Sequence, residues 1–359
     1  MKELELDVRF TTPAFLGDAH QSGAWRTPPF KALLRQWWRI AVAKQYEYDW
    51  RKVREAEGRL FGHAWLKNGE GKSWAMKSPI RLRLKERRSG GMRSWEQTRQ
   101  TVSTSGGKQR VNAHLYLGYG PVLPQEKRAQ TLKANAAIQA DETNVLKIAG
   151  PTELLDSLRD ALQLAHWFGG LGGRCRNGWG SLVFEQPESE GFIATPSTHA
   201  LPGQVCRPVA DCLNCDWPHA IGCDKSNHPL IWRTRSTYHD WQTVLAELAQ
   251  IKVDLRSELR LGNPPGKLRQ RHLLGYPVTG NGNQVNAWGA QARLASQLPF
   301  KVLPAGDGRL FGLIYHLPHD VPKQLREGIN PSELASLRTE VWQIVHECLD
   351  DDDRLQRTE

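Results

Sequence analysis

The sequence lacks any run of about 20 mostly apolar residues, the length that a membrane-spanning helix needs. Its first segment, MKELELDVRF, alternates apolar and charged side chains, so it predicts a strand and not a secretory leader. Cysteine is also scarce, because six residues among 359 do not make the disulfide framework of a small secreted domain. These absences predict a cytoplasmic protein with no membrane partner.

Acidic residues are few where basic residues are abundant. The chain has 48 Lys and Arg against 38 Asp and Glu, a formal net charge of +10. Residues 51–110 alone hold 16 basic and 5 acidic residues, a net charge of +11, interleaved with Trp65, Trp74 and Trp95. A charge run by itself is usually solvated surface, but cations set among rings are typical of a nucleic-acid interface. The composition therefore favours an RNA or DNA partner.

Hydrophobic periodicity in the first half predicts an alternation of strands and helices. Strands are expected at 4–10, 80–84, 113–120, 143–150 and 181–185, and helices at 27–41 and 155–165. The stretch 47–78 is expected to be rich in loops, and 89–110 to be one long basic loop. Strand, helix, strands, helix, strand is the split βαβ order of ferredoxin-like domains, which RNA-recognition domains share.

The second half repeats this order less completely. Strands are expected at 230–236, 294–304 and 309–318, and helices at 241–259 and from Asn330 onward, with no closing strand. The predicted fold is therefore α+β, with tandem ferredoxin-like (RRM-like) domains at 1–186 and 230–359. Residues 187–229 form the expected linker, which carries a cysteine cluster.

The first helix carries a line of cations. Thr27 is the expected N-cap and Pro28 the first helical residue. Lys31, Arg35 and Arg39 follow at four-residue spacing beside an apolar face, and no acidic residue lies between positions 26 and 39. A solvent-exposed helix face could account for these three basic residues, but binding of an external anion accounts for them better. Basic side chains also alternate along the strand near residue 82, where they give it one basic face: Arg81, Arg83 and Lys85.

The segment HWFGGLGGRCRNGWGSL, residues 166–182, follows a helix and precedes a strand. Gly169 and Gly170 need only end the helix. The later glycines predict a backbone nest for an anion, the arginines offer forked donors for phosphate, and the indole offers a face for a base. The candidate RNA-binding residues of this loop are Gly169, Gly170, Gly172, Gly173, Arg174, Arg176, Gly178, Trp179 and Gly180.

Four segments in this order, TPAFLGDA, RTPPFKALLRQWWR, RLFGHA and GGLGGRCRNGWGSL, resemble the RAMP proteins of CRISPR systems. The resemblance is closest to the first RAMP subunit of the Cmr (type III-B) effector complex. It implies tandem ferredoxin-like domains and an RNA-binding subunit that contacts guide RNA and helps capture target RNA in antiviral defence, together with other Cmr subunits. In that family a different subunit cleaves the target, so no catalytic residue is expected here.

A RAMP-type, metal-independent endonuclease that processes guide RNA is the alternative function. Such enzymes use histidine as a general acid or base. His20, His63, His114 and His166 lie in or near the motifs, although a histidine at a helix end more often packs than reacts.

Four of the six cysteines fall within the predicted linker. Cys206, Cys212, Cys215 and Cys223 include a CxxC pair, the spacing with which zinc sites begin. His219 or His228 could replace one of the thiols, and free thiols are the alternative. The spacing predicts a small zinc-binding insertion with one structural zinc.

Overall fold

The computed structural model describes residues 2–67, 70–104, 109–125, 129–185, 196, 200–260, 265–278, 283–289 and 291–358. The chain is a mixed α+β protein with two larger sheets and several small ones. Its strands are β1 (Lys2–Phe10), β2 (His63–Lys67), β3 (Ser73–Met76), β4 (Arg81–Leu84), β5 (Thr101–Ser103), β6 (Arg110–Asn112), β7 (Val122–Pro124), β8 (Gln130–Leu132), β9 (Thr143–Gly150), β10 (Leu182–Glu185), β11 (Cys206–Pro208), β12 (Ile221–Cys223), β13 (Ile231–Thr234), β14 (Phe300–Pro304), β15 (Leu310–Tyr315) and β16 (Leu355–Arg357). Its helices are α1 (Thr27–Val42), the 3-10 turn η1 (Ala43–Tyr46), α2 (Trp50–Phe61), α3 (Ala113–Gly118), α4 (Thr152–Asp156), α5 (Arg159–Phe168), α6 (Val209–Cys212), α7 (Trp241–Glu258), α8 (Gln270–Leu274), α9 (Lys323–Arg326) and α10 (Pro331–Asp350).

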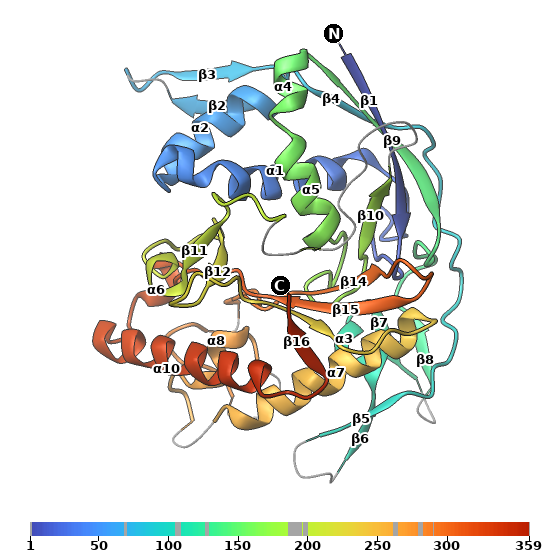
Figure 1. Cartoon of the computed structure of the whole chain (residues 1–359), viewed down its shortest axis with the longest axis vertical. Helices are drawn as coiled ribbons and strands as arrows, with labels where there is room; N and C mark the ends of the chain where they lie inside the picture. The colour runs from blue at the N-terminus through green and yellow to red at the C-terminus, as the bar shows by residue number, and fades with distance from the viewer. Residues whose placement is uncertain are drawn as a thin grey trace.

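The first large sheet has the order β10-β1-β9-β4, with every neighbouring pair antiparallel. The alternation of β1 buries Leu6, Val8 and Phe10 on one face, because successive side chains of a strand point to opposite sides. Helices α1 and α5 pack together over that buried face (Figure 1). The opposite face is open to solvent.

The second large sheet has the order β14-β15-β13-β16, again antiparallel throughout. It crosses the middle of the molecule between α1 and α5 on one side and α7 and α10 on the other (Figure 1). Leu303 and Leu313 belong to the core that contains α1 and α5, while Val302 and Ile314 belong to the core that contains α7 and α10. Both faces of this sheet are therefore buried.

The two large sheets share one connectivity. Numbered by the order of its strands along the chain, each sheet reads 4-1-3-2, with a helix after its first strand and another before its last. The closing strand of the second sheet is β16, which pairs with β13. The expectation that the second half has no closing strand is wrong, because three residues of little periodicity are enough to complete a sheet when a partner edge is available.

Three other expectations need correction. Residues 47–78 are not mainly loop, because they form α2 and the β2–β3 hairpin. Residues 113–118 form helix α3 and not a strand, since the Asn112 side chain caps it by accepting from the Leu115 N–H at 2.9 Å. Part of the expected 89–110 loop is β5, paired with β6.

Of the two helix N-caps predicted from the sequence, one is wrong and one is confirmed. Arg26 holds the N-cap position of α1 and Thr27 is already helical, so the expected Thr27 cap is wrong. Asn330 does cap α10, accepting from the N–H groups of Ser332 and Glu333. Among the residues described, no helix is long and apolar enough to cross a membrane.

Candidate nucleic-acid interface

The cations of α1 have a carboxylate partner that the sequence did not place beside them. Glu57 of α2 is 4% exposed, and its Oε1 lies 2.5 Å from Arg35 Nε, while its Oε2 lies 3.2 Å from Arg39 Nε. The sequence left these arginines without a partner on their own helix and favoured an outside anion, and the structure supplies an internal carboxylate from the next helix. Two guanidinium groups share one carboxylate, so a net positive charge remains on side chains that are 39% and 40% exposed. Burial, and then the charge of Arg35, lowers the pKa of Lys31.

The basic face of β4 lies on the solvent side of the first sheet. Arg81, Arg83 and Lys85 are exposed, and no ion pair joins them to a carboxylate within the described part of the chain. The strands beside β4 are different. Lys147 of β9 lies opposite Arg83 and forms ion pairs with Glu3 and Glu5 of β1. The open sheet face is therefore basic only along its β4 edge, and acidic along its centre.

The glycine loop has tight contacts with the rest of the chain. Gly172 and Gly180 have φ of +96° and +62°, which side chains rarely adopt. The N–H of Gly173 donates to Phe15 O at 3.0 Å, and the N–H of Gly180 donates to Pro13 O at 2.8 Å. These amides are already bonded within the protein, so the expected anion nest is not formed at these positions. The glycines allow two backbone segments to lie close together.

Gly169 and Gly170 have the role of ending α5. The Gly169 N–H donates to Ala165 O at 2.8 Å, and Gly170 bridges to Ser181 at the start of β10. Gly178 also has a positive φ, +86°, and it is buried against Leu245 of α7.

Trp179 is fully buried and cannot present a face to a base. Its ring lies 5.1 Å from Phe15, 5.6 Å from Trp95 and 5.5 Å from Trp241, measured between centroids. These three rings come from separate parts of the chain, so no local pattern indicates that they surround the indole. The predicted stacking role of Trp179 is corrected to one in the core.

The two arginines of the loop have different surroundings. Arg176 Nη1 donates to Ser296 O, and its own carbonyl accepts from the Phe300 N–H at 3.0 Å, so Arg176 joins the loop to β14. Arg174 is exposed, with φ of +61°, and its Nε donates to Tyr119 O at 2.8 Å. Of the two, Arg174 is the one placed to meet a ligand. Periodicity did not predict that cations of α7 and α8 would approach it.

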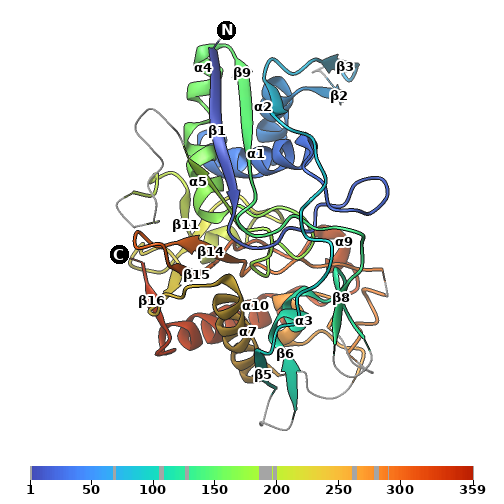
Figure 2. The ribbon, with the colours of Figure 1, turned by 90° about the vertical axis from the view of Figure 1, so that its right-hand side faces the viewer.

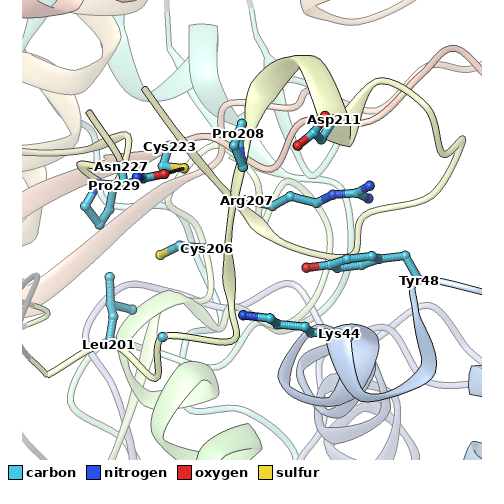
Figure 3. A pocket seen from close by; sticks show the side chains of 11 residues that line it. Lys44, Tyr48, Leu201, Cys206, Arg207, Pro208, Asp211, Cys223, Asn227 and Pro229 are labelled. Atoms are coloured by element: carbon cyan, nitrogen blue, oxygen red, sulfur yellow. Dashed lines mark hydrogen bonds between the residues drawn. The ribbon is translucent and has the colours of Figure 1, made fainter. Parts of the chain in front are cut away.

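The four clustered cysteines do not meet around one point. Cys206 and Cys223 line a cavity of about 510 Å³ beside Lys44 and Tyr48, as Figure 3 shows. The Cys212 thiol donates to Arg207 O at 3.6 Å. Within the described residues, no group of three or more His, Cys, Asp or Glu side chains is placed to hold a metal ion.

The side chain of Arg207 contacts residues of the cysteine segment and of the turn before α2. Arg207 stacks on the Tyr48 ring at 3.8 Å, and its Nη1 lies 2.8 Å from His219 Nε2 and 4.0 Å from Cys215 Sγ. Burial raises the pKa of Cys206 to about 12 and that of Cys223 to about 11, so both are neutral thiols at pH 7 in this arrangement. His228 is exposed beside Asp224.

The histidines considered for general acid–base chemistry are divided between core and surface. His114 is fully buried between Thr98 Oγ1 and Gln242 O, and His166 Nδ1 accepts from the Phe184 N–H at 3.1 Å inside the core. His63 is half-buried and His20 is exposed. Buried imidazoles cannot contact an RNA strand, so His114 and His166 have no direct role in cleavage.

Comparisons with known proteins returned structures but no sequence relatives. No family model and no curated protein matches the chain. The solved structure of Cmr1 from Pyrococcus furiosus, in its apo form, is similar over 99% of this chain and 98% of its own, with 13% identity and a TM-score of 0.46.

Two cryo-EM structures of the type III-B Cmr-beta complex also contain similar chains. One shows the complex bound to cognate target RNA, with 12% identity and a TM-score of 0.46. The other shows it bound to cognate target RNA and AMPPnP in the presence of ssDNA, with 12% identity and a TM-score of 0.43. Each match covers 94% of this chain and 99% of the other.

Proposed function

We propose that this chain is a non-catalytic, RNA-binding subunit of a type III-B CRISPR effector complex in the cytoplasm. In this role it contacts guide RNA and helps to capture target RNA. The observation that carries the proposal is the repeated 4-1-3-2 strand order of the two large sheets. That order supports the tandem ferredoxin-like arrangement that the RAMP motifs of the sequence imply.

The distribution of charge supports an RNA partner. Arg81, Arg83, Lys85 and Arg174 are exposed, and no carboxylate pairs with them among the residues described. Phosphate contacts of this kind hold a strand in register, while base pairing with a guide supplies the sequence specificity. A subunit of this type therefore needs cations and surface rings but no base-reading pocket.

Co-purification tests the proposal most directly. The chain is expressed with its genomic neighbours, isolated by a tag, and the bound RNA is sequenced. We expect guide-like RNAs of uniform length that share one repeat-derived tag, together with Cmr-type subunits. Isolation of the folded chain without RNA and without those subunits would contradict the proposal.

Titration of the purified chain with single-stranded RNA tests the electrostatic part. We expect the logarithm of the association constant to fall with log salt by about 0.7 for each phosphate neutralised. The variant Arg81→Gln with Arg83→Gln should bind more weakly and with a smaller slope. The control is Arg59→Gln, which removes one exposed cation that is already paired with Glu55 at 2.7 Å.

The arginines of α1 need a different design. Arg35→Glu with Arg39→Glu would place two carboxylates against buried Glu57. The variant Arg35→Gln, Arg39→Gln, Glu57→Gln removes the whole ion-pair group without leaving an unpaired charge. A loss of RNA affinity in this variant would assign the α1 cations to the interface.

A further inference from the structure

Four cations converge where the glycine loop meets two helices of the second half. Arg174 comes from the loop, Lys252 and Arg256 from α7, and Arg271 from α8. Helix α3 lies beside α7 at this place (Figure 2), and Tyr119, the residue that follows it, has a carbonyl that accepts from Arg174 Nε. The cluster draws on three separate parts of the chain, near residues 119, 174 and 252–271, so only the fold brings them together.

The partners of the four cations are neutral. Lys252 Nζ donates to Asn177 Oδ1 at 2.6 Å and lies 5.5 Å from the centre of the Phe300 ring. Arg256 Nη1 donates to the Tyr116 hydroxyl at 3.1 Å, and Arg271 Nε donates to Leu259 O at 2.8 Å. Each head group is therefore oriented by a hydrogen bond that does not cancel its charge.

No carboxylate forms an ion pair with these four side chains in the part of the chain that the structure describes. The carboxylate two positions along α7 from Lys252, Asp254, is held by Arg354 at 2.7 Å instead. Burial, followed by the charges of Arg256 and Arg174, lowers the pKa of Lys252 to about 7. Burial and the charge of Arg256 likewise lower the pKa of Arg271. The cluster is thus self-repelling, and a bound anion would relieve that repulsion.

An exposed ring completes the arrangement. Tyr119 is 54% exposed, one of the large hydrophobic side chains most open to solvent in the described chain. Its backbone carbonyl accepts from Arg174 Nε, so the residue that carries this exposed ring adjoins the guanidinium. An aromatic face beside a group of forked donors suits a nucleotide, since the phosphate and the base can be bound together.

We propose that Arg174, Lys252, Arg256, Arg271 and Tyr119 form a site for one phosphodiester and the adjacent base of single-stranded RNA. This proposal rests on the proposed function and names residues for it that lie outside the basic stretch 51–110. An acidic protein segment would also meet the cations, but it would leave the Tyr119 ring without a flat partner. RNA is therefore the occupant that the observations favour.

The test uses the purified full chain and a single-stranded oligouridine in a salt titration. Arg256→Gln with Arg271→Gln should weaken binding at least about tenfold at low salt and reduce the salt slope by about 0.7 per lost phosphate contact. Tyr119→Ala should weaken binding about tenfold with an unchanged slope, because stacking does not release counterions. Tyr119 is exposed, so this variant keeps the test valid if the double variant fails to fold.

The matched control removes two cations elsewhere. Arg309, paired with Asp307, and Lys323 are exposed, and Arg309→Gln with Lys323→Gln gives the same change in net charge. Cluster variants that bind RNA as tightly as this control would overturn the site and leave the proposed function intact. A wild-type chain that binds no RNA would overturn the proposed function itself, and capture of an acidic peptide with unchanged RNA affinity would assign the cluster to a protein partner.

Discussion

Glu57 shows how one residue changes the interpretation of a charged surface. It is buried on α2, yet it pairs with two arginines of α1 that spacing alone left without a partner. The sequence predicted the positions and the exposure of the arginines, because a 3.6-residue period assigns them to one side of the helix. It could not predict the partner, because Glu57 reaches α1 only through the packing of two helices.

We expect Glu57→Gln to lower the free energy of unfolding by about 1–2 kcal/mol, since it removes charged hydrogen bonds and leaves Arg35 and Arg39 to repel each other. Urea denaturation measures the change. Glu55→Gln on the same helix is the control, because its pair with Arg59 is exposed and should contribute less than about 0.5 kcal/mol. Equal stability of the two variants would contradict the structural role of Glu57.

Because several histidines are buried, we expect the free energy of unfolding to decrease in mild acid. Burial lowers the pKa of His114, His219 and His346 to about 4, while an unfolded histidine has a pKa near about 6.5. The unfolded chain therefore binds more protons than the folded chain as the pH falls from about 6.5 to about 4. We expect these histidines to make the free energy of unfolding fall as the pH is lowered through this window.

Chemical denaturation between pH 7.5 and pH 4.5 measures this slope. His346→Gln should reduce the slope by up to about 1.4 kcal/mol per pH unit, because one titrating site is lost. The glutamine can still meet His316, whose Nδ1 lies 3.0 Å from His346 Nε2. Hydrogen bonds from Arg357, opposed by burial, lower the pKa of Asp350, so this carboxylate titrates below the window. A stability that does not change with pH in the window would contradict the prediction.

At the scale of elements, the glycine loop is where the role predicted from the sequence differs most clearly from the role seen in the structure. Its glycines predicted an open, ligand-binding backbone, and the structure instead places the loop against the segment around Phe15. The composition was informative about backbone conformation, because Gly172, Gly178 and Gly180 have positive φ. The composition did not indicate what would pack against the loop, because a glycine allows either a ligand or another segment of the chain to come close.

We expect Gly180→Ala to destabilise the protein by more than about 2 kcal/mol, because φ is +62° and a Cβ would collide with the Leu171 carbonyl. Gly178→Ala should cost less, since the nearest obstacle is the flexible end of Leu245. Gly306→Ala is the control, with nothing within 4 Å of its Cβ. Thermal unfolding ranks the three variants, and a Gly180 variant as stable as the Gly306 variant would contradict the packing role.

The sequence spacing of the four clustered cysteines predicts a zinc site. The gaps between Cys206, Cys212, Cys215 and Cys223 predict close to one zinc per purified chain, lost in Cys212→Ser with Cys215→Ser. Mass spectrometry under native conditions and elemental analysis measure it. A metal-free, fully folded wild type would refute the site, and the Arg207 arrangement seen here would then be the state that stabilises β11 and β12.

At the scale of the whole molecule, the two sheets are joined through buried polar contacts. Lys301 of β14 is 1% exposed, and its Nζ donates to the carbonyls of Gly169 and Leu182, at the end of α5 and the start of β10. Tyr315 of β15 donates to Phe168 O at 2.7 Å beside it. These contacts fix the second sheet against the first.

Lys301→Met should lower the free energy of unfolding by about 2–4 kcal/mol, since two buried carbonyls lose a donor. Denaturant titration measures the loss, and Lys323→Met, at an exposed position, is the control. If both variants unfold at the same denaturant concentration, Lys301 does not join the two parts.

The sequence by itself determined the alternating face of β1, the apolar stripe of α1, the cap of α10 and the excess of positive charge. Each of these features follows from the periodicity of apolar residues, from a single capping residue or from the numbers of basic and acidic residues. Tertiary structure alone decided that Trp179 is enclosed, that Glu57 pairs with α1, and that Arg174 lies near the cations of α7. The physical reason is that periodicity states which face of an element is apolar, while the residues that cover this face come from distant parts of the chain.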